Sequence, residues 1–263
     1  MFTTFVINLD KDTERLTFMD AQLQMVGIEY RRQSAVLGKK YQPTPLEYDE
    51  SKAIKKGGRP LLPGELGCAL SHAAVLSAIV KERIAYTLVL EDDVSLPPNF
   101  KQIIEEEIYK NKAHRWDYLL FDYVAVGLPF IRQWIQGVGK TFCHTFFSTP
   151  FTAIAILLYA LLKSFYVIPL SLFEGVRERY RQHYPGSVRF FRPLYFAGAY
   201  LITLKGAEKM LPLTQPIVYT ADQLPNRARI LSGLRLRGYA PQIVNQQKDR
   251  FGSSILDLKG HEL

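Results

Sequence analysis

Short apolar runs alternate with amphipathic stretches along most of the chain. Runs rich in β-branched and aromatic residues predict buried strands, and they span residues 3–9, 28–36, 85–91, 116–123 and 238–244. Stretches with apolar residues on one helical face predict helices, and they span residues 10–27, 62–82 and 99–110, while 195–213 combines a strand with a helix. The strand–helix–strand order at the start predicts an α/β fold, with a mainly parallel sheet flanked by helices.

Two regions depart from this alternation. Residues 37–63 are rich in Gly, Pro, Lys and Tyr without periodicity, which predicts a long loop of the kind that is often functional. Residues 124–195 form an insertion, in which 142–173 contains one lysine, one histidine and no acid, and 177–192 is densely basic. We expect residues 1–263 to form one domain that carries this hydrophobic helical insertion.

Composition and charge narrow the class of protein. The chain is 48% hydrophobic and 22% charged, as globular proteins are. Its formal net charge of +8 suggests an anionic partner, which could be nucleic acid, an acidic membrane surface or a phosphorylated substrate. The two cysteines form no CxxC pattern, so we expect buried thiols in a reduced compartment. The N-terminus has no basic n-region, which predicts a cytoplasmic protein without a signal peptide.

Three consecutive acids, Glu91, Asp92 and Asp93, end the apolar run at 85–91. In a doubly wound sheet, ligands bind outside the carboxyl ends of the parallel strands. Crowded carboxylates repel one another, and a divalent cation such as Mg²⁺, Mn²⁺ or Ca²⁺ would neutralise them and hold a phosphorylated donor. The alternatives are that these acids cap the next helix or are solvated loop residues.

Four blocks together resemble glycosyltransferase family 25, the lipooligosaccharide-type glycosyltransferases. The blocks occur in the order FVINLDKDTERL, LPGELGCALSH, LVLEDDV and AGAYLITLKGAEKML. The resemblance covers roughly 1–123 and 195–255 and leaves the insertion unmatched. It implies a GT-A fold with a Rossmann-like sheet, and a UDP-sugar donor. It also implies that Glu91 and Asp93 are the outer acids of a DxD-like motif that binds Mn²⁺ or Mg²⁺.

The same resemblance places the donor around the first strand and the helix after the long loop. We expect Asn8, Arg15 and Asp92 on the donor side, although Arg15 could instead pair with Asp12 or Glu14 on the surface. The helix adds Glu65, Ser71 and His72 as donor-binding candidates. The alternative for His72 is a structural, hydrogen-bonded histidine. Gly64 and Gly67 either allow close backbone approach or shape the helix start.

The family implies an inverting reaction, which needs a carboxylate base to take the acceptor's proton. We favour Asp222 as this catalytic base, and the alternative is that Asp222 caps the helix beginning near Gln223. Asp117 and Asp122 are weaker candidates. A third metal ligand could come from the tail, between residues 245 and 249.

The insertion suggests where the acceptor is. The run at 142–162 is long enough to cross a bilayer, but a crossing would separate two halves of one catalytic fold. We therefore expect helices lying in the membrane interface beside the basic stretch at 177–192. A buried helix or a dimer interface are the alternatives. Residues 227–237 are also basic and could serve the same purpose.

Taken together, the sequence predicts a metal-dependent hexosyltransferase that acts on a lipid-linked oligosaccharide of the lipopolysaccharide core, peripheral to the inner membrane. Galactose is slightly ahead of glucose as the sugar transferred, with a β-galactosyltransferase expected. The rival reading is a non-enzymatic protein whose basic patches bind anionic lipid or nucleic acid; the basic residues lack an RNA-recognition signature, so we expect no nucleic-acid partner. A catalytically inactive family member is a third reading, which the intact acids argue against.

Overall fold

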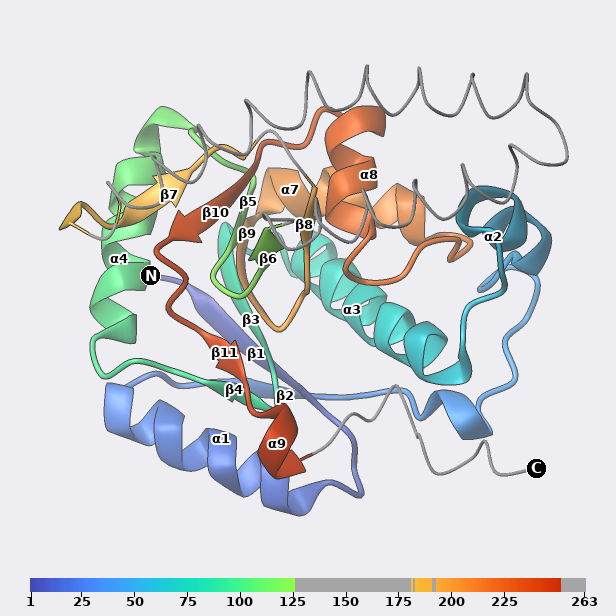
Figure 1. The fold of residues 1–263 in the computed structure, drawn as a ribbon, viewed down its shortest axis with the longest axis horizontal. Helices are drawn as coiled ribbons and strands as arrows, with labels where there is room; N and C mark the ends of the chain where they lie inside the picture. Colours follow the sequence, from blue (N-terminus) through green and yellow to red (C-terminus); the bar gives the residue numbers. More distant parts are fainter. Residues whose placement is uncertain (126–180, 182, 191–192, 252–263) are drawn as a thin grey trace, which may run out of the picture.

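The computed structural model describes residues 1–125, 181, 183–190 and 193–251. Within them, one seven-stranded sheet has the order β2-β1-β3-β9-β5-β10-β7 (Figure 1). Its strands are β1 Thr3–Asn8, β2 Arg31–Ser34, β3 Tyr86–Glu91, β5 Tyr118–Leu120, β7 Gly186–Val188, β9 Ala199–Thr203 and β10 Leu236–Ala240. Two small two-stranded sheets pair β4 Val94–Ser95 with β11 Asn245–Gln246 and β6 Val124–Ala125 with β8 Leu194–Tyr195.

Five of the seven strands point the same way. β1 is parallel to β2 and β3, and β5 is parallel to β10. β9 is antiparallel to both β3 and β5, so β3 and β5 share one direction, and β7 runs antiparallel to β10. The prediction of a mainly parallel α/β sheet is confirmed, and an antiparallel strand in its middle is the feature that the sequence pattern did not indicate.

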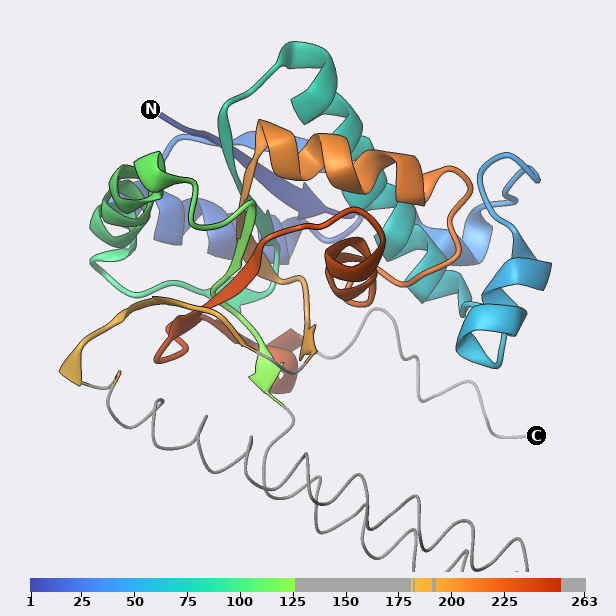
Figure 2. The same ribbon diagram turned by 90° about the horizontal axis from the view of Figure 1, so that it is seen from above.

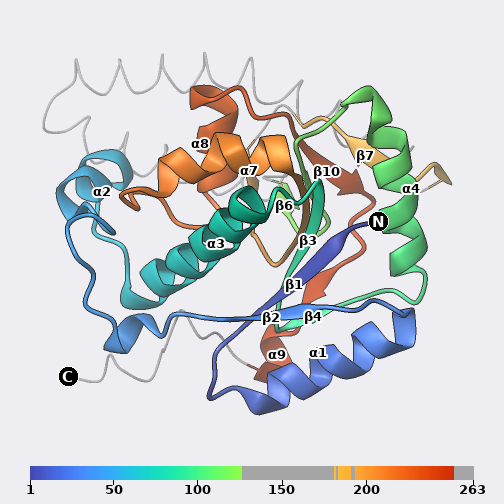
Figure 3. The ribbon, with the colours of Figure 1, turned by 180° about the vertical axis from the view of Figure 1, so that it is seen from behind.

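Helices cover both faces of this sheet (Figure 3). On one face lie α1 Thr13–Val26 and α4 Phe100–Lys110; on the other lie α3 Pro63–Glu82, α7 Leu204–Met210 and α8 Leu224–Leu231. α7 lies alongside α3 (Figure 2). The short elements are η1 Gly38–Lys40, α2 Glu50–Gly57, η2 Asn111–Ala113, η3 Leu211–Thr214 and α9 Lys248–Phe251.

Side-chain alternation along the strands builds two cores. In β1, Val6 packs with Met19 and Leu23 of α1, while its neighbours Phe5 and Ile7 pack toward α3. Each fully buried apolar side chain of this kind contributes about 1.5–3 kcal/mol relative to an exposed one. Gly27 ends α1 in the left-handed conformation, at φ 69°, as its place in the sequence predicts.

Three sequence expectations need correction. The stretch 37–63 is not a loop throughout, because α2 forms within it, begun by Asp49, whose side chain accepts a hydrogen bond from the Lys52 N–H. The predicted strand 28–36 is reduced to β2, and the last sheet strand lies at Leu236–Ala240, earlier than 238–244. Strand pairing thus selects the polar residues of the first range and begins two residues before the second.

In the described part of the chain, α3 is the one helix long and apolar enough to cross a membrane. Its apolar side packs into the core through Val75, Leu76 and Ile79, as a core helix does. The apolar run at 142–173 lies outside the described residues, as do residues 177–180, 182, 191 and 192 of the basic stretch. The membrane-interface expectation therefore stays a prediction, and so does the assignment of residues 1–263 to one domain.

Candidate active site

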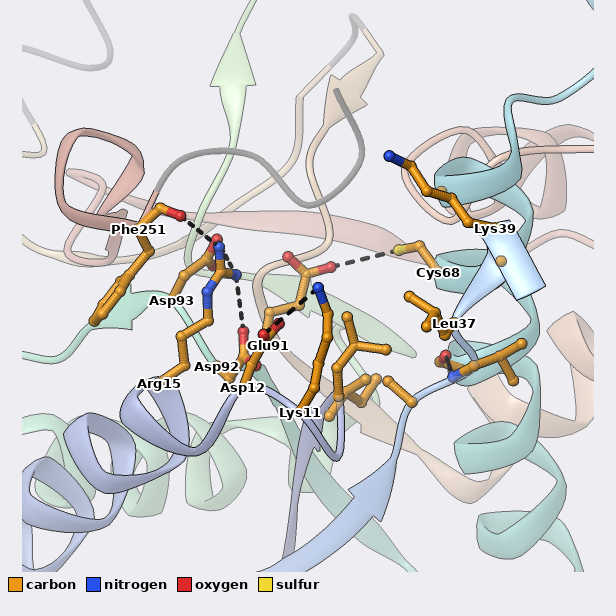
Figure 4. Close-up of a pocket in the computed structure, with 17 residues that line it drawn as sticks. Lys11, Asp12, Arg15, Leu37, Lys39, Cys68, Glu91, Asp92, Asp93 and Phe251 are labelled. Atoms are coloured by element: carbon orange, nitrogen blue, oxygen red, sulfur yellow. Dashed lines mark hydrogen bonds and ion pairs between the residues drawn. The ribbon is translucent and has the colours of Figure 1, made fainter. Parts of the chain in front are cut away.

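A cavity of about 360 Å³ opens where β1, β2 and β3 end (Figure 4). These strands are parallel, so the chain leaving each of them reaches the same edge of the sheet. The lining residues are Ile7, Leu9, Lys11, Asp12, Arg15, Ala35, Val36, Leu37, Gly38, Lys39, Gly64, Cys68, Ser71, Glu91, Asp92, Asp93 and Phe251. The acids Glu91, Asp92 and Asp93 thus line a cavity at the edge of the sheet where the sequence predicts a ligand.

Glu91 is the last residue of β3, and Asp92 and Asp93 form the turn that leads into β4. The strand is held on both sides, because Glu91 lies opposite Ile7 of β1 and its N–H donates to the Gly198 carbonyl at 2.7 Å. The position of this acidic turn is therefore fixed by the centre of the sheet.

Asp92 is buried in a network with the start of α1. Its Oδ2 accepts a hydrogen bond from Asn8 Nδ2 at 2.7 Å, and its Oδ1 lies 3.2 Å from Arg15 Nη1. Burial raises the pKa of Asp92, and the contacts with Asn8 and Arg15 only partly offset that rise. The structure thus brings together three residues that the sequence places on the donor side.

Asp93 and the end of the described chain meet at the same arginine. Arg15 Nη1 lies 3.5 Å from Asp93 Oδ2, and its Nη2 donates to the Phe251 carbonyl at 3.0 Å. The guanidinium also lies over the Phe251 ring, 5.4 Å from its centroid. Arg15 is buried, so the surface pairing with Asp12 or Glu14 considered above is not what the structure shows.

Glu91 connects the strand end to α3. Its Oε1 lies 3.2 Å from His72 Nε2 and 3.7 Å from Cys68 Sγ, and its Oε2 accepts from Gln246 Nε2 at 3.1 Å. Burial raises the pKa of Glu91, but the hydrogen bonds with His72 and Cys68 and the charge of Arg15 outweigh it and leave that pKa below its usual value. Burial also raises the pKa of the Cys68 thiol well above the ordinary one.

His72 is 4% exposed and bridges Glu91 to the core. Its Nδ1 lies 3.0 Å from the Tyr200 hydroxyl, and the two rings stack at 5.7 Å. With Glu91 ionised, the ring proton lies on Nε2 and Nδ1 accepts from Tyr200. The arrangement fits the structural reading of His72, which acts on the cavity through Glu91.

Ser71 and Glu65, the two other predicted donor-binding residues on α3, make contacts within the protein. Ser71 Oγ donates to the Gly67 carbonyl at 2.6 Å and accepts from the Val36 N–H at 2.9 Å, although it also lines the cavity. The Glu65 carboxylate accepts from the Leu62 N–H and forms an ion pair with Arg59. The Arg59 guanidinium lowers the pKa of Glu65 despite partial burial. Glu65 is not among the cavity's lining residues.

The loop after β2 is pressed against the start of α3. A Cβ added at Gly67 would lie 2.4 Å from the Val36 carbonyl oxygen, and one added at Gly38 would lie 1.6 Å from the Pro63 carbonyl oxygen. Both positions therefore require glycine for close backbone approach, as one of the two readings of Gly67 expected. This contact forms one wall of the cavity, to which Gly38 and Lys39 belong.

Asp222, the predicted catalytic base, lies on the same side of the molecule. Burial raises the pKa of both Cys68 and Tyr118, and the charge of Asp222 adds to that rise, so its carboxylate lies in their neighbourhood, although Asp222 is not among the cavity's lining residues. Its Oδ1 accepts a hydrogen bond from the Thr220 hydroxyl. It does not cap α8, because Gln223 is the N-cap residue of that helix and no side chain caps it.

The two weaker base candidates differ in position. Asp117 precedes β5 and pairs with Lys209 and Arg235 at the opposite end of the strand, which makes it structural. Asp122 follows β5 at the carboxyl end, where Gln242 Nε2 donates to its Oδ1 at 3.4 Å. The tail also reaches this edge, through the Gln246 side chain on Glu91 and the Gln247 N–H, which donates to the Asp93 carbonyl at 2.7 Å.

Sequence reasoning missed several residues of the cavity. Lys11 and Lys39 bring positive charge into the lining, Lys11 beside Asp12 and Lys39 across the cavity from the acidic turn (Figure 4). Phe251 comes from the tail, and Cys68 from the same helix turn as Ser71. Lys39 lies in the stretch 37–63 that was expected to be functional, whereas Phe251 and Cys68 carried no local signal.

The donor atoms at this edge fit two kinds of cation. The carboxylates of Glu91 and Asp93 supply oxygen ligands alone, which suit Mg²⁺ or Mn²⁺. Glu91 also belongs to a second group, since the ligand atoms of Cys68, His72 and Glu91 all lie within 4.8 Å of one another. The described residues thus include oxygen ligands of the predicted kind, and they offer a thiol-containing group that shares Glu91 with them.

The fold and the site define a class: a Rossmann-like α/β protein with an acid-tipped central strand over a ligand cavity, as in nucleotide-sugar glycosyltransferases. A family model described as "Glycosyltransferase family 25 (LPS biosynthesis protein)" matches residues 1–225. The chain therefore belongs to glycosyltransferase family 25, and the resemblance noted in its sequence is confirmed.

Curated relatives match part of the chain. It is 33% identical over 104 residues to "Glycosyltransferase 25 family member" of Anopheles gambiae, which covers 37% of this chain and 17% of the relative. "Procollagen galactosyltransferase 2" of Homo sapiens is 33% identical over 103 residues, 37% of this chain and 16% of the relative. "Probable inactive glycosyltransferase 25 family member 3" of Rattus norvegicus is 31% identical over 121 residues, 43% of this chain and 21% of the relative.

The aligned stretches thus span at most about a fifth of these relatives' length. The matches support a glycosyltransferase, and one of the three names, that of the human relative, specifies the sugar as galactose.

Proposed function

We propose that the protein is a metal-dependent, inverting hexosyltransferase that moves galactose, or else glucose, from a UDP-sugar to a lipopolysaccharide or lipooligosaccharide core acceptor. The observation that carries this proposal is the Glu91–Asp93 turn at the end of β3, facing a cavity formed by the ends of three parallel strands. Family membership and the galactosyltransferase name of the human relative support the hexosyl donor.

Charges in the cavity suit a nucleoside diphosphate. Lys11, Arg15 and Lys39 bring cationic groups to its lining. A diphosphate attracts such groups strongly, and guanidinium groups bind it with paired hydrogen bonds. In this proposal Arg15 holds the turn through Asp92 and Asp93 and helps to orient the diphosphate above it.

Glu91 and Asp93 would hold Mn²⁺ or Mg²⁺, which supplies Lewis-acid stabilisation of the charge on the departing diphosphate when it is bound. Asn8 donates a hydrogen bond to the Asp92 carboxylate, and this contact holds the turn of residues 91–93 against the end of β1. His72 holds Glu91 through its Nε2 and fixes the direction of that carboxylate.

Asp222 is proposed as the base that removes the proton of the acceptor hydroxyl. Three observations support it: the carboxylate does not cap α8, it lies near Cys68 and Tyr118, and it is half-buried. A positioned base of this kind contributes about 10²–10⁴-fold to the rate. The Thr220 hydroxyl, bonded to Asp222 Oδ1, orients the carboxylate.

The acceptor is proposed from charge. A net charge of +8 favours an anionic partner, and core oligosaccharides with phosphorylated sugars on a lipid at the cytoplasmic face of the inner membrane have that character. Peripheral attachment through the insertion would bring the protein to such an acceptor.

One rival function has a specific observation in its favour. Some relatives carry "probable inactive" in their names, the rat protein among them. An inactive member used as a binding protein would keep the fold and lose turnover.

The deciding experiment measures donor binding and turnover together. Purified protein is tested with UDP-galactose, UDP-glucose, UDP-GlcNAc and CMP-sialic acid, each with and without Mn²⁺, by thermal shift and by release of the nucleotide. We expect stabilisation by one UDP-hexose in the presence of Mn²⁺ and turnover with a core oligosaccharide acceptor.

The matched variants are Asp93→Ala and Glu105→Ala, the latter an exposed acid on α4. Asp93→Ala should abolish turnover while the protein stays folded, and Glu105→Ala should keep full activity. Full activity of folded Asp93→Ala would overturn the proposal. UDP binding without turnover in the native protein would favour the inactive-member reading.

A further inference from the structure

The group formed by Cys68, His72 and Glu91 has a different chemistry from the acidic turn. Cys68 and His72 are four residues apart on α3, so they lie on one face of the helix, a single turn apart. Glu91 meets them from the end of β3. The group therefore combines a sulfur, a ring nitrogen and a carboxylate oxygen from two rigid elements of the core.

Its dimensions agree with those of a zinc site. Zinc bonds to sulfur at about 2.3 Å and to nitrogen or oxygen at about 2.0–2.2 Å, so tetrahedral ligands are separated by roughly 3.3 Å (N to O) and 3.5 Å (S to O). The corresponding distances here are 3.2 Å from His72 Nε2 to Glu91 Oε1 and 3.7 Å from Cys68 Sγ to Glu91 Oε1. The third separation is within 4.8 Å, so a small rotation of the Cys68 side chain closes the triangle.

We propose that Cys68, His72 and Glu91 form a zinc-binding site at the floor of the cavity. A thiolate ligand favours Zn²⁺ over Mn²⁺ and Mg²⁺, which prefer oxygen. The site is separate from the oxygen-only set of Glu91 and Asp93, with which it shares one ligand. Cys68 and Glu91 both line the cavity and point toward each other (Figure 4), which gives zinc an access route.

Charge and proton balance are consistent with this site. Zinc displaces the thiol proton to water, and the thiolate, the Glu91 carboxylate and Zn²⁺ sum to zero net charge in a largely buried place. The His72 ring stays neutral, with its proton on Nδ1. The Nδ1–H then donates a hydrogen bond to the Tyr200 hydroxyl oxygen, 3.0 Å away. This contact orients the ring, as outer partners of zinc-bound histidines do.

One consequence rests on the proposed function. If Glu91 binds the donor's metal, zinc at Cys68 and His72 withdraws this carboxylate from the acidic turn. Micromolar zinc should then inhibit transfer, and the fraction of activity that zinc removes should be smaller in Cys68→Ser, with each protein compared with its own zinc-free rate.

The test uses Co²⁺ as a spectroscopic probe and needs no donor or activity. Tag-free protein with Cys143→Ser, so that Cys68 is the remaining cysteine, is titrated with Co²⁺. We expect a near-ultraviolet sulfur-to-cobalt charge-transfer band and intense visible bands of a tetrahedral ion, both abolished by one equivalent of Zn²⁺. Cys143 lies outside the described residues, and this substitution only removes its thiol.

Four variants in this background assign the ligands. Cys68→Ser should remove the charge-transfer band, and His72→Gln and Glu91→Gln should each weaken cobalt binding by about 100-fold or more. Tyr200→Phe should weaken it by about 10–100-fold, as outer partners do. Glu65→Gln, which removes a carboxylate of the same helix outside the group, should bind as tightly as the parent.

Two results would overturn the proposal. One is a folded parent protein, verified by circular dichroism, that shows no charge-transfer band at saturating Co²⁺. The other is a band that is present but unchanged in His72→Gln and Glu91→Gln, which would mean that the thiol binds cobalt alone. Neither result bears on the proposed transfer reaction, because donor binding and turnover are measured separately.

Discussion

Opposite ends of the central sheet carry buried aspartates in opposite electrostatic surroundings. Asp117 precedes β5, and Lys209 and Arg235 both reach its carboxylate at 2.7 Å. Asp92 follows β3, which runs in the same direction as β5, and it shares Arg15 with Asp93. Two cations, Lys209 and Arg235, thus contact the single carboxylate of Asp117. At the other end, Arg15 contacts both Asp92 and Asp93.

The pKa values express this difference. Burial raises the pKa of Asp117, but the hydrogen bonds from Arg235 and Lys209 outweigh it and lower the pKa overall. Burial also raises the pKa of Asp92, and there the contacts do not compensate. Asp117, whose burial is outweighed by its partners, holds the fold together, whereas the charged form of Asp92 would gain from a cationic ligand because its contacts do not offset its burial. Of the two, Asp92 lines the cavity.

The largest expected effect concerns activity at the cavity edge. Asp222→Asn removes the proposed base but leaves an oxygen to accept the hydrogen bond from Thr220. We expect kcat to fall by about 10²–10⁴-fold, with the free energy of unfolding unchanged within about 0.5 kcal/mol. Steady-state kinetics and urea unfolding measure the two quantities. Unchanged kcat would assign the base to another acid, with Asp122 next in line.

Asp117→Asn tests the opposite end of the sheet. Removing this charge weakens hydrogen bonds to Lys209 and Arg235, so we expect the free energy of unfolding to fall by about 2–3 kcal/mol at pH 7 with kcat preserved. In the folded protein the pKa of Asp117 is below the ordinary aspartate value of 3.8. The stabilisation that its charge gives to the fold is therefore complete above that value and is lost as the pH falls through the folded pKa. Urea unfolding between pH 3 and 7 should therefore show the variant's deficit shrinking in acid. A deficit independent of pH would contradict the charge-based reason.

Gly67→Ala tests the cavity wall where α3 packs against the loop after β2. The added Cβ would meet the Val36 carbonyl oxygen at 2.4 Å, so α3 or the loop after β2 must move. We expect a loss of about 1–3 kcal/mol in the free energy of unfolding and weaker donor binding. Gly57→Ala is the matched control, because nothing lies within 4 Å of its added Cβ, and alanine there should gain up to about 1 kcal/mol. Equal effects of the two substitutions in thermal unfolding would refute the close-contact explanation.

The smallest expected effect is that of Asp92→Asn. In the folded protein the pKa of Asp92 is raised. The contribution of its carboxyl group to the free energy of unfolding is therefore favourable below the ordinary aspartate value of 3.8 and is lost as the pH rises through the folded pKa. At pH 7 the asparagine variant should therefore be as stable as the native protein or up to about 1 kcal/mol more stable, and this advantage should vanish toward pH 4. Urea unfolding at both pH values gives the sign. A clear destabilisation at pH 7 would mean that the contacts with Asn8 and Arg15 outweigh burial.

Much of the fold was predictable because it depends on local patterns. Alternating and helical periodicities located most of the sheet strands and helices, and the acids that interrupt the run ending at Leu90 marked the ligand edge. The order of four sequence blocks gave the family. Strand direction was harder, since the apolar sequence of β9 is compatible with either direction, and its antiparallel course follows from pairing with β3 and β5.

The sequence by itself determined the two-layered burial of the strands, the helix ends such as Gly27 and the acidic turn after β3, because each depends on neighbouring residues. Only the tertiary structure decided which acids are compensated and which are crowded. Asp92 and Asp117 are both buried aspartates beside strands, yet their partners come from positions distant in the chain: Arg15 for one, Lys209 and Arg235 for the other. The electrostatic state of a carboxylate is set by such distant neighbours, which is also why Cys68 became a metal-ligand candidate only when α3 was placed against Glu91.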